Sequence, residues 1–134
     1  MKIDGSCHCG YIQYEAEVDP DAVLICHCTD CQKLSASAFR TVISIQDESF
    51  TMLAGSPKIY IKVGDSGNKR EQAFCPECGS GLYATSMGDG PKVYNLRLGT
   101  ATQRDELVPK RQIWASSALS WLPKLGGIPK VEKQ

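Results

Sequence analysis

The sequence has no excess charge of either sign and no long apolar run. Its 134 residues include fifteen acidic and fifteen basic side chains. A balanced chain without a basic run interleaved with aromatic residues offers no bulk attraction to nucleic acid. No apolar stretch is long enough to cross a bilayer, which argues against a membrane protein. The first residues lack the apolar core and cleavage site of a secretory signal, so we expect a cytoplasmic location.

Sustained helical periodicity and internal repeats are also scarce. No segment carries a helical stripe of apolar residues beyond about two turns. The only repeated motif is Cys-His-Cys, at 7–9 and 26–28, which excludes a solenoid or a propeller. The length suits one domain with its own core. We therefore expect a single domain over residues 1–134, with an irregular tail from about residue 122.

The chain does contain many short segments with strand character. Residues 11–18 alternate apolar and polar side chains, which is the period of a strand with one buried face. A short helical turn is predicted over 29–35, with Thr29 as its N-cap. Further strands are predicted over 22–26, 39–45, 50–53, 58–63, 71–75, 81–84, 93–98 and 112–115. This pattern predicts a mainly antiparallel β domain.

The seven cysteines are the most informative residues. Their odd number argues against a complete disulfide framework, and clustered thiols in a reducing compartment indicate metal or redox chemistry. Cys75-Pro-Glu-Cys78-Gly79 has the spacing of a zinc knuckle, whose tight turn directs both sulfurs inward. Cys7 and Cys9 would direct their sulfurs to the same side of an extended backbone. Together the two pairs predict a structural zinc site with four thiolates.

The other three cysteines are Cys26, Cys28 and Cys31. Cys26 and Cys28 have the spacing of Cys7 and Cys9, and Cys28 and Cys31 have the spacing of the knuckle, so all three sulfurs can face one point. Three protein ligands leave an open position on a tetrahedral metal, as in catalytic zinc sites. Thiolates favour zinc over magnesium or calcium. The spacing leaves an alternative, in which Cys26 and Cys28 join the knuckle and Cys31 groups with Cys7 and Cys9. A Cys-x-x-Cys pair can also be a redox disulfide without any metal.

Two histidines lie inside these motifs. His8 and His27 each stand between two cysteines, and an extended backbone would turn their rings away from the neighbouring sulfurs. Neither is expected to bind the same ion as its neighbours. For His27 we favour a structural, hydrogen-bonded role over that of a general base beside the open metal position.

Six motifs, taken together and in order, resemble the glutathione-dependent formaldehyde-activating enzyme family. They are CHCG (7–10), CHCTDCQK (26–33), AFR (38–40), FCPECGS (74–80), LRLGT (96–100) and IWASS (113–117). The resemblance extends from residue 6 to about residue 121 and implies a β-tent fold of stacked antiparallel sheets. It also implies two zinc ions per chain, a structural one at Cys7, Cys9, Cys75 and Cys78 and a catalytic one at Cys26, Cys28 and Cys31.

The activity implied by the resemblance is the condensation of glutathione with formaldehyde to S-(hydroxymethyl)glutathione, classed in reverse as a carbon-sulfur lyase reaction. The partners are then a small thiol and an aldehyde. Arg40, Lys33 and Arg97 are candidate contacts for the carboxylates of glutathione. Family members commonly have a histidine before the Ile-aromatic pair and a Lys-Ala-Pro-Trp run, where this chain has Gln112 and residues 118–121 (ALSW). These departures concern the identity of the substrate.

Two rival functions belong to other classes. A non-catalytic carrier would bind glutathione at the same metal without accelerating formation of its aldehyde adduct. A structural zinc module for protein interaction would have a fourth protein ligand at the second metal and no pocket beside it.

Overall fold

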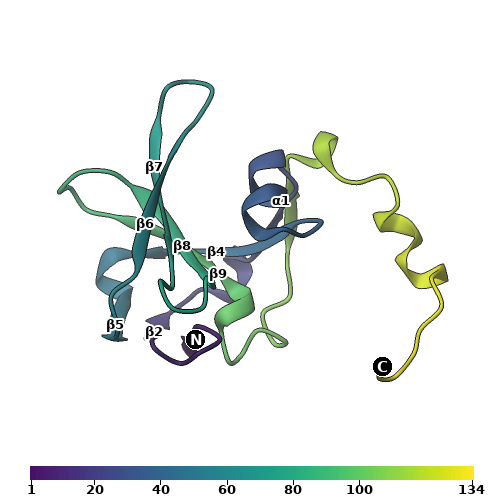
Figure 1. The fold of residues 1–134 in the computed structure, drawn as a ribbon, viewed down its shortest axis with the longest axis horizontal. Helices are drawn as coiled ribbons and strands as arrows, with labels where there is room; N and C mark the ends of the chain where they lie inside the picture. The colour runs from purple at the N-terminus through teal and green to yellow at the C-terminus, as the bar shows by residue number, and fades with distance from the viewer.

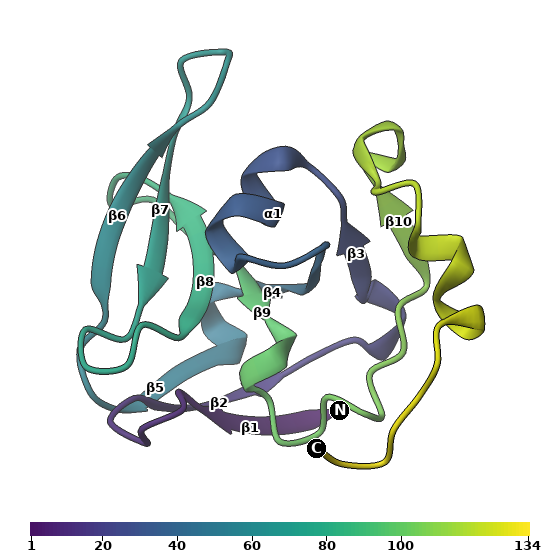
Figure 2. The same ribbon diagram turned by 45° about the vertical axis from the view of Figure 1, so that its right-hand side comes forward.

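The computed structural model describes residues 1–134, which form two β-sheets (Figure 1). The smaller sheet has three strands in the order β1-β2-β5, and the larger has seven in the order β10-β3-β4-β9-β8-β7-β6. Figure 2 shows the smaller sheet beneath the larger one. The strands are β1 (Lys2–Ser6), β2 (Gln13–Glu17), β3 (Leu24–Cys26), β4 (Arg40–Gln46), β5 (Phe50–Ala54), β6 (Lys58–Val63), β7 (Lys69–Phe74), β8 (Gly81–Ser86), β9 (Val93–Arg97) and β10 (Arg111–Ile113).

The mainly β fold predicted from the sequence is confirmed, with two differences. First, β10 runs parallel to β3, whereas all other neighbouring strands are antiparallel. Second, the sequence did not predict β1, because Ile3 is the only large apolar side chain in this strand. Gly5 makes the pairing of β1 with β2 possible, since a Cβ atom there would collide with the ring of Tyr14 and the backbone of Thr100.

The main core lies between the two sheets. Strand alternation directs Ile43 and Ile45 of β4 and Leu96 of β9 toward the smaller sheet, where they meet Ile3 and Tyr14. All five side chains are almost completely buried. Burial of each such side chain contributes roughly 1.5–3 kcal/mol to folding. The alternate residues of β4 and β9 point to the opposite face of the larger sheet, and that face carries the candidate site.

Helix α1 (Thr29–Ser35) covers this opposite face, between the β6–β7 hairpin and strand β3 (Figure 2). Its bounds are those predicted, but its N-cap is Cys28 rather than Thr29, because the Cys28 sulfur accepts the N–H of Cys31 at 3.2 Å. Short 3-10 helices complete the chain at Pro20–Ala22, Asp47–Ser49, Leu98–Thr100, Ala115–Ser117 and Leu122–Gly127.

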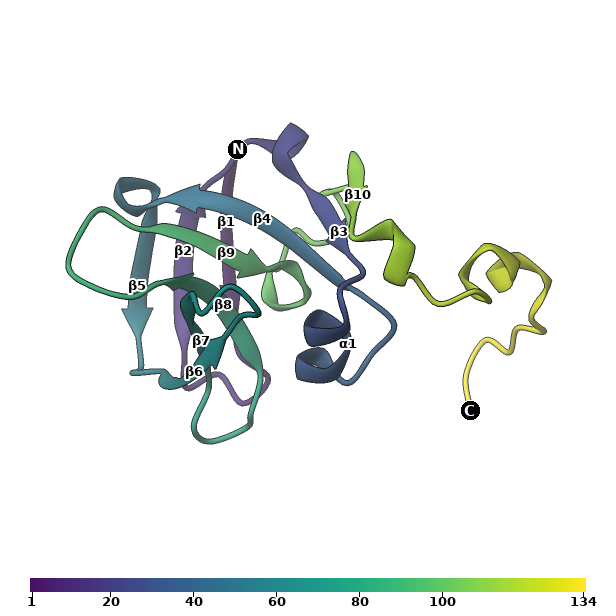
Figure 3. The ribbon, with the colours of Figure 1, turned by 90° about the horizontal axis from the view of Figure 1, so that it is seen from above.

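The C-terminal tail extends away from the sheets (Figure 3). It was predicted to be irregular from about residue 122, and it contains one 3-10 helix, Leu122–Gly127, with mostly exposed residues. None of the helices in the chain combines the length and the apolar composition required to span a membrane.

Candidate metal centres

The fold gathers the seven cysteines into two groups, and within each group all sulfurs lie within 4.8 Å of one another. We call Cys7, Cys9, Cys75 and Cys78 the four-sulfur group, and Cys26, Cys28 and Cys31 the three-sulfur group. All seven thiols are free. The alternative grouping of Cys31 with Cys7 and Cys9 does not occur.

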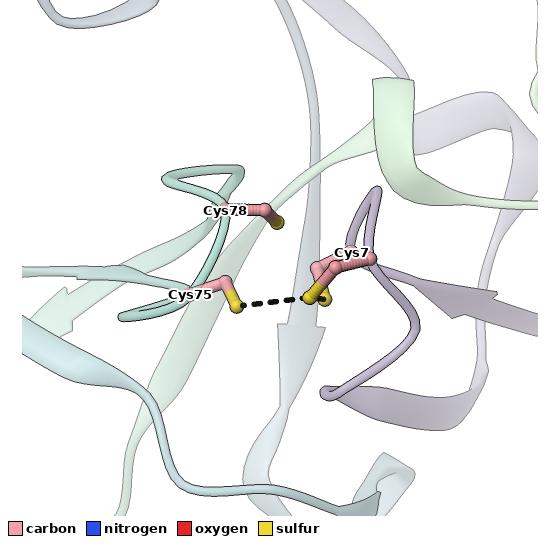
Figure 4. A group of neighbouring side chains, drawn as sticks. Cys7, Cys75 and Cys78 are labelled. Atoms are coloured by element: carbon pink, nitrogen blue, oxygen red, sulfur yellow. Dashed lines mark hydrogen bonds between the residues drawn. The ribbon is translucent and has the colours of Figure 1, made fainter.

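The four-sulfur group has the spacing of a tetrahedral thiolate site. The sulfur of Cys9 lies 3.6 Å from that of Cys7 and 3.8 Å from that of Cys75. A tetrahedron with Zn–S bonds of about 2.3 Å has S···S edges of about 3.8 Å, whereas a disulfide requires about 2.05 Å. Figure 4 shows Cys75 and Cys78 on one loop with their sulfurs directed toward Cys7 on a second loop. The donor set therefore fits zinc.

Two turns carry these four ligands. The sequence predicted an extended backbone for Cys7 and Cys9, but the two residues lie in a turn after β1. The backbone N–H of Gly10 closes this turn by donating to the Cys7 carbonyl at 3.1 Å. Cys75 and Cys78 lie in the knuckle between β7 and β8, where Gly79 adopts φ +79°. Glycine takes such a left-handed conformation without steric cost. The predicted knuckle geometry is therefore present, and the Cys-x-Cys pair reaches the same point by a different backbone.

Three sulfurs of the four-sulfur group accept hydrogen bonds. The backbone N–H of Ile12 donates to Cys7 Sγ at 3.2 Å, and that of Glu77 donates to Cys75 Sγ at 3.4 Å. The hydroxyl of Ser80, 3.3 Å from Cys78 Sγ, is the main reason that the pKa of Cys78 falls to about 5. The chain thus supplies part of the negative charge that a cation requires.

The three-sulfur group joins the end of β3 to the start of α1. Cys26 is the last residue of β3, Cys28 caps the helix and Cys31 lies in its first turn. Burial raises the pKa of Cys31 to about 12, and it also raises the pKa of Cys26. Burial acts in the same direction on Cys28, but the N–H of Cys31, the neighbouring thiols and the ammonium of Lys62 lower its pKa overall. These three sulfurs also fit a thiolate-binding ion, and no fourth His, Cys, Asp or Glu belongs to the group.

A cavity of about 320 Å³ opens beside the three-sulfur group. Its floor is one face of the larger sheet, because residues paired across neighbouring strands share a face. At one end of this face Cys26 pairs with Arg40, and Val42 pairs with Arg97. Further along the same face Ala84 pairs with both Asn95 and Gln72, and Lys62 pairs with Arg70. Every one of these residues lines the cavity, and Cys31 and Leu34 of α1 cover it.

Cationic side chains are concentrated in this cavity, which we call the cationic cavity. Arg97 donates a hydrogen bond to Gln72 Oε1 at 2.8 Å, and burial lowers its pKa to about 10, with a smaller contribution from Arg40. Lys62 forms an ion pair with Asp30 at 2.7 Å at the rim. Arg70 also lines the wall. The cavity is thus suited to a ligand that carries more than one carboxylate.

The structure separates the three predicted contacts for glutathione. Arg40 and Arg97 both line the cationic cavity, whereas Lys33 is exposed on α1 and is not part of its lining. The sequence did not single out Lys62 or Arg70 as candidate site residues. Lysine and arginine in short strands look like solvated residues, and only the strand register shows that these two share a face with the cysteines.

Neither histidine belongs to a sulfur group, although His8 lies in the turn after β1 and not on the extended backbone that the sequence predicted. His27 is 2% exposed, its Nε2 lies 2.6 Å from Gln112 Oε1, and its ring packs edge-on against Phe39. Its Nδ1 is buried without a hydrogen-bond partner, and the residue is not part of the cavity lining. His8 is exposed, and its backbone N–H donates to Ser80 Oγ at 3.0 Å. These contacts favour the structural interpretation of His27.

Comparisons with known proteins identify a family and solved structures of similar fold. Residues 2–117 match the family described as "Glutathione-dependent formaldehyde-activating enzyme". The crystal structure of a protein from Rhodobacter sphaeroides superposes with a TM-score of 0.60 at 17% sequence identity, covering 81% of this chain and 98% of that chain. At this identity the likeness concerns the fold alone. No curated protein matches the chain.

Proposed function

Since this chain belongs to the glutathione-dependent formaldehyde-activating enzyme family, we propose that it is a zinc-dependent enzyme that joins a thiol to a small aldehyde. The thiol is glutathione or a related thiol, and the aldehyde is formaldehyde or a related small aldehyde. In reverse the reaction is that of a carbon-sulfur lyase. The observation that carries the proposal is the opening of the three-sulfur group onto the cationic cavity.

The two sulfur groups have different roles in this proposal. The four-sulfur group holds a structural zinc that ties the turn after β1 to the knuckle between β7 and β8, two segments that are distant in the sequence. The three-sulfur group holds the second zinc, and its missing fourth ligand leaves room for the substrate. A zinc ion in such a site would hold the substrate sulfur as a thiolate at neutral pH or polarise the aldehyde oxygen.

The remaining side chains of the cavity bind and orient the thiol. Arg40 and Arg97 receive the carboxylates of glutathione, and their planar guanidinium groups suit bidentate contacts. Holding both reactants in attack geometry is itself a large part of the catalysis of such a bimolecular reaction. Lys33 has no place in this arrangement, because it lies outside the lining of the cavity.

The reaction also requires a proton at the aldehyde oxygen. The thiolate sulfur forms a bond to the carbonyl carbon, the π electrons move to the oxygen, and the oxygen takes up a proton. The ammonium of Lys62 lies at the rim of the cavity together with Cys28 and is held there by Asp30. We assign the delivery of this proton to Lys62, which water can then reprotonate.

The carrier remains the second candidate, because His27 is turned away from the cavity and the lining contains no imidazole base. A carrier would bind the same thiol at the same three sulfurs. A structural zinc module is disfavoured, since the three-sulfur group has no fourth protein ligand and a cavity lies beside it.

Native mass spectrometry and exchange kinetics test the proposal together. We expect two zinc ions per chain, one glutathione bound per chain, and faster equilibration of glutathione with formaldehyde than in uncatalysed mixing. Cys28→Ser is the matched variant, and it should retain one zinc and lose both glutathione binding and rate enhancement. Binding without rate enhancement would identify a carrier, and two zinc ions without glutathione binding would identify a structural module.

We also propose a cytoplasmic location. Both sulfur groups require free thiols, and a reducing compartment keeps thiols free.

A further inference from the structure

A second cavity, of about 390 Å³, adjoins the cationic cavity. Leu34, Arg40, Gln72 and Arg97 line both cavities, so the two cavities adjoin at these four side chains. We call the second one the aromatic cavity. A molecule bound at the three-sulfur group would have only these four side chains to pass before it reached the aromatic cavity.

The lining of the aromatic cavity differs from that of its neighbour. Four large side chains of mainly apolar character line it, from four different elements: Leu34 of α1, Tyr60 of β6, Phe74 of β7 and Tyr83 of β8. Leu34 is 43% exposed and Tyr60 is 54% exposed, so about half of each residue is left uncovered by the rest of the chain. Lys62 and Arg70, which line the cationic cavity, are absent from this one. Its interior thus suits an apolar group rather than a carboxylate.

Leu34 connects this cavity with the reacting end of the site. It lies three residues after Cys31 on α1, and side chains at that spacing are neighbours on one face of a helix. Tyr60 stands opposite Gln72 on the same sheet face as Cys26 and Arg40. A substituent on the reacting carbon would pass Leu34 and reach the ring of Tyr60.

From these observations, and on the basis of the proposed function, we infer that the preferred carbonyl substrate carries an aromatic or branched aliphatic substituent, which occupies the aromatic cavity. The thiol sulfur bonds to the carbonyl carbon, and the thiol's proton balances the proton gained by the oxygen. No oxidant or reductant is needed. Formaldehyde has no substituent and would leave the aromatic cavity unfilled.

Glutathione itself fits the aromatic cavity less well than it fits the cationic one. Its two carboxylates and its amine require polar partners, and the aromatic cavity offers cations only at the shared boundary. Removing an apolar group from water into this cavity has no such cost. The two cavities therefore divide the product between them, with the peptide in one and the aldehyde substituent in the other.

Stable thioethers test this division without any turnover. On the zinc-loaded protein we compare S-benzylglutathione with S-methylglutathione by isothermal titration calorimetry. We expect the benzyl compound to bind at least about tenfold more tightly, since an apolar group in a fitted pocket contributes about 10- to 200-fold in discrimination. Tyr60→Ala and Leu34→Ala should each reduce this ratio several-fold. Ile59→Ala is the control, because Ile59 is also exposed on β6 but points to the other face of the sheet.

The outcomes separate this inference from the proposed function. Equal binding of the two thioethers, or a benzyl preference that survives both cavity variants, would overturn the inference and leave the glutathione site intact. If neither thioether nor glutathione binds the zinc-loaded protein, the proposed function fails and the inference fails with it. In kinetic assays with glutathione, phenylacetaldehyde should be favoured over formaldehyde, and Tyr60→Ala should reduce this preference. Turnover of formaldehyde alone would also overturn the inference.

Discussion

The buried ring of His27 donates from Nε2 to the side-chain oxygen of Gln112 at 2.6 Å. His27 stands between two cysteines of the three-sulfur group, and Gln112 occupies the position at which the family resemblance suggested a histidine. The contact joins β10 to the segment after β3. A second hydrogen bond reinforces it, in which the backbone N–H of His27 donates to the Ile113 carbonyl at 3.1 Å. Gln112 therefore supports the backbone of the three-sulfur group and does not line the cavity.

Replacement of Gln112 should weaken the fold. Gln112→Ala leaves a buried N–H of His27 without its acceptor, which costs about 1–3 kcal/mol. We expect a lower free energy of unfolding in urea. Gln112→Glu keeps an acceptor and should restore most of the loss. Gln46→Ala, at an exposed position on β4, is the control and should stay within about 0.5 kcal/mol of the wild type. An equal effect of Gln112→Ala and Gln46→Ala would show that the contact contributes nothing.

The two sulfur groups should differ in their importance for folding. Cys78→Ser removes a ligand of the four-sulfur group, and structural zinc can contribute about 10–16 kcal/mol, comparable to the whole stability of a domain. We expect this variant to unfold or aggregate. Cys28→Ser should lose one metal and the response to thiols but keep its circular dichroism spectrum and its cooperative unfolding. Equal loss of structure in both variants would contradict the assignment of one structural and one reactive site.

The sequence predicts the local features of this fold better than the distant ones. The bounds of α1 and β6 agree with prediction, because turn residues mark their ends. For β7 the sequence suggested a start at residue 71, two residues late, since Lys69 and Arg70 look like loop residues. The pairing of β10 with β3 joins segments 87 residues apart, since Arg111 pairs with Leu24, and no local pattern predicts such a pairing.

The candidate site shows the same division. Cysteines at zinc-ligand spacing could be identified from the sequence, because the spacing within each pair is a local property. The cationic cavity could not, because its wall depends on the register of β6 with β7 and of β8 with β9. A shift of one residue in either register would turn Lys62 or Arg97 to the other face. Arg40 and Arg97 were proposed as glutathione contacts through the family resemblance. Lys62 and Arg70 were identified as residues of the cavity lining only from the structure.

Acidification should remove metal from the three-sulfur group first. A metal must displace the proton of each thiol, and burial raises the pKa of Cys31 to about 12 and raises that of Cys26. In the four-sulfur group, by contrast, the pKa of Cys78 is about 5, so its sulfur is already a thiolate at neutral pH. The pKa of Cys9 in the same group is raised to about 12. Affinity falls as pH falls, by about tenfold per unit for each displaced proton.

We therefore expect two separate steps of metal loss when the pH is lowered from 8. Thiolate-to-cobalt charge-transfer absorption of the cobalt-substituted protein measures both steps. The step at higher pH should be absent in Cys28→Ser, because that variant lacks the three-sulfur group. A single step for the wild type, or a higher-pH step that survives in Cys28→Ser, would contradict the predicted order.

The arginines of the cationic cavity should determine the affinity for glutathione. Removing one charge-assisted hydrogen bond costs about 1.5–3 kcal/mol, so Arg40→Gln and Arg97→Gln should each raise the dissociation constant by about 10- to 100-fold. Arg97→Lys should recover only part of this loss, since lysine cannot reproduce the planar contact or the bond to Gln72 as well. Lys33→Gln removes a charge at an exposed position outside the cavity lining and should leave the affinity unchanged. Calorimetry, with the zinc content of each variant checked by native mass spectrometry, measures these changes. If Lys33→Gln weakened binding as much as Arg97→Gln, glutathione would have to lie across the outer surface of α1 instead of inside the cavity.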